Sequence, residues 1–345
     1  MRDLIWQGFN GDEADQRVFD GAIPYIAGSR KSFTDASFAQ PGRYSRQHED
    51  HDVYGDQFPF SYAVATDPLT GEVDSIFSTC QDNHTCPKLM HVDISTEFWQ
   101  ARAALVSTSP AGEPLGMPEN VRLYFMSAAP HFKQWNAESE RTDLCQFSTN
   151  PLSPASAMRA LTQALRDWVF DDKVPPESRY PTVADKTLVP LPQLNLTSLS
   201  SKVFLPVYNV LRVRDHSSVP PQAGARYPVL VPQLDEDGLP LAGVKDPAVA
   251  ALLGTYLGWN LRAEGFAKGS LCGLEGSYLS FPPTEQAAGS DPRQPLSDRY
   301  ADEAAYLAAL EQEGNGTGEG WPDASGRRAS RSAARPAHVR KEPDR

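Results

Sequence analysis

Residues 88–106, KLMHVDISTEFWQARAALV, contain the change of hydrophobic pattern that decides the fold class. The first part, 88–95, is a short apolar run bounded by a proline and a polar turn, which is typical of a buried β-strand. From there on, Phe98, Ala101 and Leu105 recur at helical spacing, which predicts a helix over 95–106. A buried strand followed directly by a helix is the unit from which α/β proteins are built.

The chain repeats this unit further on. Residues 120–129, NVRLYFMSAA, form a second apolar run, and residues 153–172, SPASAMRALTQALRDWVFDD, carry the clearest amphipathic stripe in the sequence. Strand, helix, strand, helix is the order that builds a mostly parallel sheet flanked by helices. We therefore expect 86–170 to be the regular βαβα core of an α/β domain.

Long loops should surround this core, because the 345 residues include 30 prolines and 24 glycines. We expect one incomplete α/β domain over 1–310, which includes a loop-rich insertion at 11–80 and a C-terminal elaboration at 180–306. Residues 311–345 have few large apolar side chains to bury, so we expect a disordered basic tail.

The distribution of charge limits the possible partners. The formal net charge is −12, and residues 326–345 hold seven Lys or Arg against two acids, about +5, which leaves about −17 for the rest. Binding phosphates needs a basic face, so the body of the chain is not expected to bind nucleic acid. No run approaches the roughly 18 apolar residues of a membrane span. We expect a soluble protein, either cytoplasmic or exported, whose oligomeric state the sequence leaves open.

The first ten residues, MRDLIWQGFN, resemble the end of a helix more than its beginning. Leu4, Ile5 and Trp6 form an apolar cluster, and Gly8 and Asn10 supply a stop. A helix normally begins at a capping Ser, Thr, Asp or Asn and runs eight residues or more. We expect these residues to be the back half of a helix whose beginning lies upstream.

Cysteines and histidines offer further candidate sites. Cys80 and Cys86 flank a short polar loop and are expected to form a disulfide or to be two free thiols, while Cys145 and Cys272 either pair or are buried thiols. The cluster HEDHD at 48–52 has metal-ligand residue types, but His-x-x-His without a helical pattern or a third ligand is a weak signal. We expect a solvated loop there, and no metal or cofactor.

Two polar residues follow the predicted strands. Glu97 comes just after the strand at 88–95, and His131 comes at the end of the strand at 120–129. Catalytic groups gather beyond the carboxyl ends of parallel strands. A carboxylate followed later in the chain by a histidine is the second half of a Ser-acid-His triad. The alternative is a carboxylate that favours a helix start and an ordinary loop histidine.

Several stretches together resemble a family of largely uncharacterised bacterial proteins, the α/β-hydrolase domain proteins. They run in order from the first residues to about residue 306: QGFNGDEADQRVFDGAIPYIAG, FAQPGRYSRQHEDH, DQFPFSYAVATDPLTGEVD, DISTEFWQARAAL, ENVRLYFMSAAPH, NPLSPASAMRALTQALRDWV, PPESRYPTVADKTLVP and LGTYLGWNLR. They are specific in combination, although none is a general catalytic signature.

The resemblance implies a partial α/β-hydrolase fold and a serine hydrolase, expected to act on small carboxylic esters. It assigns Glu97 as the acid and His131 as the base, with the nucleophilic serine on an elbow immediately before the stretch RDLIWQGFN. The chain departs from the family at this point, because no Gly-x-Ser-x-Gly occurs in its 345 residues. We therefore expect a C-terminal portion that has the acid and base of a Ser-Glu-His triad and lacks its serine.

Two other functions stay open at this stage. A truncated or binding protein without catalysis would also lack the serine elbow. A metal-dependent hydrolase would use His48, Glu49, Asp50, His51 and Asp52 as ligands.

Overall fold

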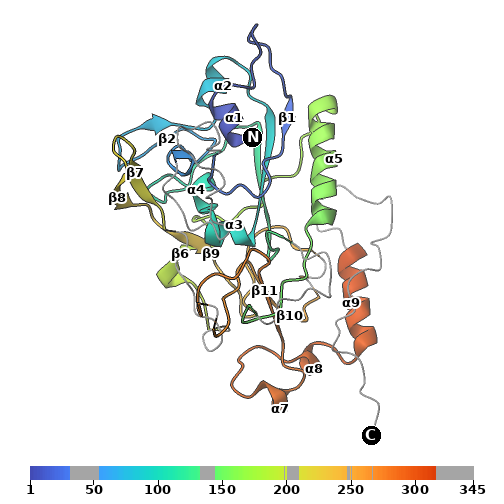
Figure 1. Ribbon diagram of the computed structural model, residues 1–345. Coiled ribbons are helices and arrows are strands. Elements are labelled where there is room, and N and C mark those ends of the chain that lie inside the picture. The colour runs from blue at the N-terminus through green and yellow to red at the C-terminus, as the bar shows by residue number, and fades with distance from the viewer. Residues whose placement is uncertain are drawn as a thin grey trace.

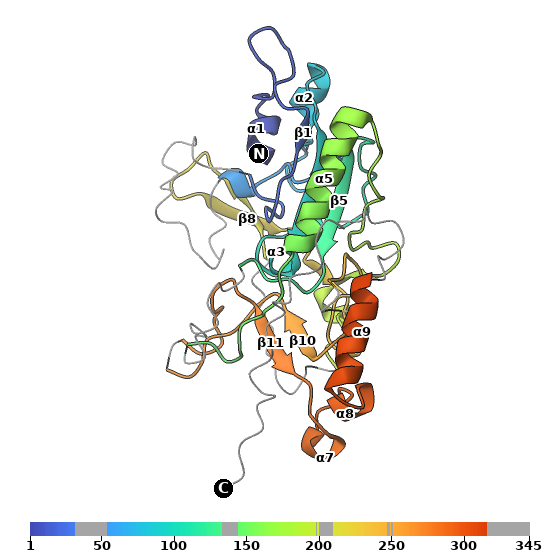
Figure 2. The ribbon, with the colours of Figure 1, turned by 90° about the vertical axis from the view of Figure 1, so that its right-hand side faces the viewer.

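A computed structural model describes residues 1–31, 54–132, 144–197, 199, 210–246, 249, 251–265 and 267–315. At its centre lies a parallel sheet of three strands, β1 (Gly21–Ala22), β4 (Lys88–Ile94) and β5 (Val121–Met126), in the order β1-β4-β5. The helix α5 (Ala155–Asp171) runs alongside this sheet in both views (Figures 1 and 2). The strands at 88–95 and 120–129 and the helix at 153–172 are thus confirmed, with ends that differ by a few residues.

The two faces of the central sheet have different neighbours. Side chains alternate along a strand, so Met90, Val92 and Ile94 pack toward Leu161 and Trp168 of α5. On the opposite face, an apolar core gathers around Leu89 and Leu123 with side chains from α1, α2, α3 and the C-terminal elaboration. His91 and Asp93 lie on the same face of β4 as Leu89 and are fully buried.

The helix predicted over 95–106 is wrong as one element. The chain forms α3 (Ser95–Gln100) and α4 (Ala104–Ser107), and Arg102 between them has a φ of 53°. The Nη2 of Arg102 donates to the carboxylate of Asp56 at 2.8 Å in the interior. A buried guanidinium needs such a partner, and the break in the helix brings it there.

The expectation of a mostly parallel sheet holds only for the central sheet. Elsewhere in the described residues the strands form antiparallel pairs, β2 (Ala65–Thr66) with β3 (Val73–Asp74) and β10 (Gly254–Leu257) with β11 (Ser277–Ser280) among them. Antiparallel pairs need no crossover helix, which fits a chain that adds short ladders around the α/β core. The remaining antiparallel pairs are β6 (Leu188–Pro190) with β9 (Leu230–Pro232) and β7 (Arg212–Asp215) with β8 (Gln222–Arg226).

The described part of the segment 11–80, the expected loop-rich insertion, contains short strands and a helix. It contributes β1 to the central sheet, where Gly21 pairs with Lys88. A two-residue strand is too short to produce an alternating pattern, so the sequence did not reveal it. The other elements are α1 (Arg2–Trp6), η2 (Tyr54–Asp56), α2 (Ser78–Asp82), η4 (Leu191–Gln193), α7 (Glu285–Ala288), α8 (Leu296–Arg299) and α9 (Glu303–Asn315).

The C-terminal helix α9 reaches Asn315, five residues beyond the domain boundary expected at 310. The remainder of the predicted disordered tail, 316–345, lies outside the described residues. Among the helices that the structure describes, none has both the length and the apolar character needed to cross a membrane.

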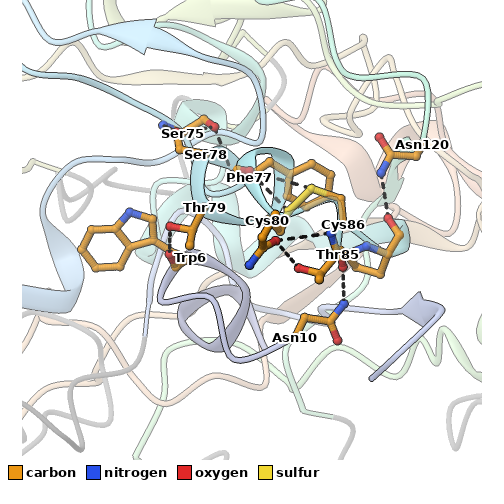
Figure 3. The surroundings of a disulfide bond; sticks show 12 residues. Trp6, Asn10, Ser75, Phe77, Ser78, Thr79, Cys80, Thr85, Cys86 and Asn120 are labelled. Carbon is orange, nitrogen blue, oxygen red and sulfur yellow. Dashed lines mark hydrogen bonds between the residues drawn. A yellow bond between two sulfur atoms is a disulfide. The ribbon is translucent and has the colours of Figure 1, made fainter. Parts of the chain in front are cut away.

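All four cysteines form disulfides, which decides between the alternatives left by the sequence. Cys80 pairs with Cys86, and Cys145 pairs with Cys272. Figure 3 shows the first bond beside the N-terminal helix: the Thr79 hydroxyl donates to the Trp6 carbonyl at 2.8 Å, and the Asn10 amide donates to the Thr85 carbonyl at 2.6 Å. The disulfide-closed turn of α2 is therefore part of the support on which α1 rests.

Candidate active site

Glu97 lies in the first turn of α3, directly after β4, and is almost completely buried. Its Oε2 accepts the backbone N–H of Ile94 at 3.2 Å, as the third residue of a capping box does. This bond holds the side chain against the end of β4 and leaves Oε1 for another partner.

His131 follows β5 in the chain, and its loop is tied to the start of α3. Its backbone N–H donates to the Thr96 hydroxyl at 3.0 Å, and the Ser95 N–H donates to the Ala129 carbonyl at 3.1 Å. The ring of Phe132 meets the imidazole edge-to-face with centroids 4.5 Å apart. These contacts place the histidine loop directly over the first turn that carries Glu97.

The structure brings together the two residues that the sequence nominated. The Nδ1 of His131 lies 2.5 Å from Glu97 Oε1, with side-chain exposures of 10% for His131 and 2% for Glu97. A carboxylate bound to Nδ1 fixes the orientation of the imidazole and stabilises the imidazolium. The arrangement can therefore accept and return a proton at Nε2.

The environment of Glu97 changes its proton affinity. Burial raises the pKa of its carboxyl, the hydrogen bond and charge of His131 oppose that rise, and the charge of Asp93 adds to it. The net direction is upward.

A second histidine–carboxylate pair, not predicted from the sequence, lies in the interior at β4. His91 Nε2 is 2.7 Å from Asp93 Oδ2, and Tyr62 and Tyr180 bind the two ends of the pair at 2.8 and 2.6 Å. His91 and Asp93 have no exposed surface. The only signal was two polar residues at alternate positions of an otherwise apolar strand. Because it has no access to solvent, this pair is not a candidate for contact with substrate.

The metal-binding alternative falls largely outside what the structure shows. The cluster at 48–52 lies in the part of the chain that is not described. Among the described ranges, no group of three or more His, Cys, Asp or Glu is gathered in a way that would hold a metal ion.

A hollow near the end of β5 is separate from the Glu97–His131 pair. Its lining includes Met126, Ala129, Pro154, Val244 and Asp246, and neither Glu97 nor His131 belongs to it. Most of these side chains pack on the α5 side of the sheet. The hollow therefore adds no group to the candidate active site.

Comparison with known families agrees with the geometry of this site. A family model described as an alpha/beta hydrolase domain matches residues 1–317. The chain belongs to the α/β-hydrolase domain family. No curated protein and no solved structure shows significant similarity to it. Family membership makes a hydrolase the supported class of activity.

The position of the pair is set by the parallel strands of the central sheet. In parallel sheets, functional side chains gather beyond the carboxyl ends of the strands. Here Glu97 follows β4 and His131 follows β5, and these strands are parallel neighbours with Ile94 opposite Met126. Both carboxyl ends therefore meet at one edge of the sheet of this α/β-hydrolase domain.

Proposed function

We propose that this α/β-hydrolase domain protein hydrolyses small carboxylic esters, with His131 as general base and Glu97 as the acid that orients it. One observation carries the proposal: the 2.5 Å contact between His131 Nδ1 and Glu97 Oε1 at the carboxyl ends of two neighbouring parallel strands. A buried carboxylate that binds Nδ1 and so orients the imidazole is what a Ser-acid-His mechanism requires.

The proposed reaction has two stages. In the first, Nε2 of His131 takes the hydroxyl proton of a serine, and the serine oxygen attacks the ester carbonyl carbon. The tetrahedral adduct collapses, the bond to the alcohol oxygen breaks, and the imidazolium returns the proton to that oxygen. In the second stage, water loses a proton to Nε2, attacks the acyl-enzyme and releases the acid. Glu97 stabilises the imidazolium in both stages.

The serine belongs, in this proposal, to the turn that leads into α1, where the family resemblance expects the nucleophile elbow. The surroundings of α1 favour this position. Arg2, in its first turn, donates to the carbonyls of Arg30 at 3.0 Å and Ser29 at 3.3 Å. The Ser29 N–H in turn donates at 3.0 Å to the carbonyl of Ala101, at the end of the helix that carries Glu97. One loop thus links the entry of α1 to α3.

The coding DNA ahead of Met1 provides the first test. We expect an in-frame Gly-x-Ser-x-Gly a few codons before the stretch RDLIWQGFN. An intervening stop codon or frameshift would remove the esterase proposal for this gene product.

Kinetics on the form that carries this serine provide the second test. His131→Ala should lower kcat for a short-chain aryl ester by roughly 10²–10⁴-fold, and Glu97→Gln should lower it by a smaller factor. His84→Asn is the matched control, because His84 is exposed in the loop after α2 and Asn tolerates its φ of 60°. Full activity in His131→Ala would exclude His131 from the mechanism.

A binding protein without catalysis is the second candidate, and one observation favours it: the 345 residues contain no Gly-x-Ser-x-Gly. On that reading the Glu97–His131 pair is a remnant that stabilises the edge of the sheet. The protein would then bind ester analogues without turnover, and His131→Ala would weaken folding and leave hydrolysis at the uncatalysed rate in both forms.

A further inference from the structure

Asp93 is a buried carboxylate that three hydrogen-bond partners hold in place. Its Oδ2 accepts from Tyr180 at 2.6 Å and lies 2.7 Å from His91 Nε2, while its Oδ1 accepts the Gly28 N–H at 2.9 Å. Its side chain has no exposed surface. Each of these partners favours the ionised carboxylate, which is the form that burial alone would disfavour.

One line of contacts runs from Asp93 through Gly28 to the end of α3. The loop at Gly28 approaches α3 so closely that a Cβ at this glycine would overlap the Ala101 carbonyl, and its φ of 56° is one that glycine adopts without strain. The next residue, Ser29, donates its N–H to the same carbonyl at 3.0 Å. The Asp93–Gly28 bond therefore fixes the loop that receives the end of α3.

A second line of contacts runs through Tyr180. Its hydroxyl, bound to Asp93, also lies 3.1 Å from the Ala103 carbonyl. The N–H groups of Ala103 and Ala101 both point to the Glu97 carbonyl, at 3.2 and 2.9 Å. Both lines thus start at Asp93 and end at the residues that bind the main chain of Glu97.

We propose that Asp93, together with Tyr180, is a positioning group for the Glu97–His131 pair, because it fixes both ends of the short helix that carries Glu97. The N-terminal end of α3 begins at Ser95, two residues after Asp93 in the chain, and the C-terminal end is held through Gly28 and Tyr180. α3 has only six residues, all of them buried. A helix of that length has little stability of its own, so its orientation depends on these outside contacts. The catalytic meaning of this inference rests on the proposed function, while the positioning itself does not.

The charged and titratable groups around the network are few. Asp93 is faced by His91 and Tyr180, with Tyr62 and Arg2 further along. Glu97 is faced by His131, Asp93 and Tyr25. Burial, and after it the charge and hydrogen bond of Asp93, raise the pKa of Tyr180 well above its usual range. Tyr180 therefore keeps the proton that it donates to Asp93.

Tyr180→Phe tests the inference, because it removes one hydroxyl and leaves the ring among Phe98 and Phe125. The measurement is an NMR titration of the full chain with isotopically labelled histidine, in which His131→Gln identifies the His131 signal. We expect the pKa of the His131 imidazolium to fall by at least roughly half a unit, a threefold loss of proton affinity, because Glu97 no longer holds its stabilising position.

Tyr124→Phe is the matched control. Its hydroxyl donates to the Pro176 carbonyl at 2.6 Å, and its ring packs on the α5 side of the sheet. This variant loses one phenol hydrogen bond without touching Asp93, so the His131 titration should match wild type. Asp93→Asn, if it folds, should lower the pKa of His131 at least as far as Tyr180→Phe.

The possible outcomes separate this inference from the proposed function. A His131 midpoint in Tyr180→Phe equal to that in Tyr124→Phe overturns the positioning role, whatever the activity. A His131 midpoint that is lowered in Tyr180→Phe and unchanged in Tyr124→Phe supports it, even where no ester is hydrolysed. Where hydrolysis occurs, Tyr180→Phe should lower kcat about three- to tenfold at an unchanged KM, because a misplaced base costs rate more than binding.

Discussion

Lys31 shows how burial acts on a single residue. Its ammonium lies in the interior, donates to the carbonyls of Gln57 at 2.5 Å and Pro59 at 3.0 Å, and stands 4.8 Å from the centre of the Trp6 ring. Burial, helped by the charge of Arg2, lowers its pKa to about 7, and nearby carboxylates oppose that shift. Between pH 7 and the usual lysine range the unfolded chain therefore binds more protons than the folded one.

This linkage predicts that Lys31 makes the free energy of unfolding rise with pH. Relative to Lys31→Met, the wild-type free energy of unfolding should increase between pH 7 and 10 by on the order of 1–3 kcal/mol. Urea unfolding at several pH values measures it. Lys268→Met is the control, because Lys268 is exposed and its pair with Glu264 is a surface contact. Parallel curves for wild type and Lys31→Met would contradict the prediction.

The two histidine–carboxylate pairs show what the sequence reveals about single residues. Glu97 and His131 were predicted because chain order places each of them just after a strand, and the ends of parallel strands meet. His91 and Asp93 were not, because a polar residue in an apolar strand does not indicate its partner. Tyr180, which binds Asp93, lies 87 residues away in the chain, and only the folded structure brings them together.

The same contrast holds for elements. The strands at 88–95 and 120–129 and the helix at 153–172 were predictable because their hydrophobic periods run long enough to be read locally. The break at Arg102 was not, because its cause is Asp56, a buried partner 46 residues earlier. Glu97 caps the start of α3 with Oε2 and binds His131 with Oε1, so its two roles do not compete.

The two disulfides constrain elements over different lengths of chain, and this predicts unequal contributions to stability. Cys145 and Cys272 are 127 residues apart, whereas Cys80 and Cys86 are six apart. By the entropy of loop closure, removing the long-range bond should cost about 5 kcal/mol and removing the short one about 2 kcal/mol.

Paired alanine variants compare the two bonds. Cys145→Ala with Cys272→Ala should lower the urea midpoint further than Cys80→Ala with Cys86→Ala, with dithiothreitol-treated wild type below both. The short bond has its own local effect, because its turn supports α1 through Thr79 (Figure 3). A larger loss from the Cys80–Cys86 pair would mean that this support outweighs chain entropy.

At the scale of the whole molecule, one family match spans both the α/β core and the antiparallel elaboration. The family match extends to residue 317, and α9 ends at Asn315. The ring of Tyr306 in α9 lies 5.3 Å from that of Tyr300, edge to face. Burial, and after it the nearby phenols of Tyr278 and Tyr306, raises the pKa of Tyr256 in β10. α9 therefore lies near the β10–β11 pair, beside which Figure 2 shows it.

This proximity predicts where the chain can be shortened. A protein ending at residue 317 should keep its free energy of unfolding within about 0.5 kcal/mol of the full chain, because no described contact is lost. A protein ending at Tyr300 removes the half-buried ring of Tyr306 and should lose about 1–3 kcal/mol, the amount expected for exposing an aromatic side chain. Thermal and urea unfolding of the two truncations beside the full chain make the comparison. Equal loss in both would place a stabilising contact beyond residue 317 and overturn the domain boundary, and no loss in either would show that α9 contributes nothing to the stability of the fold.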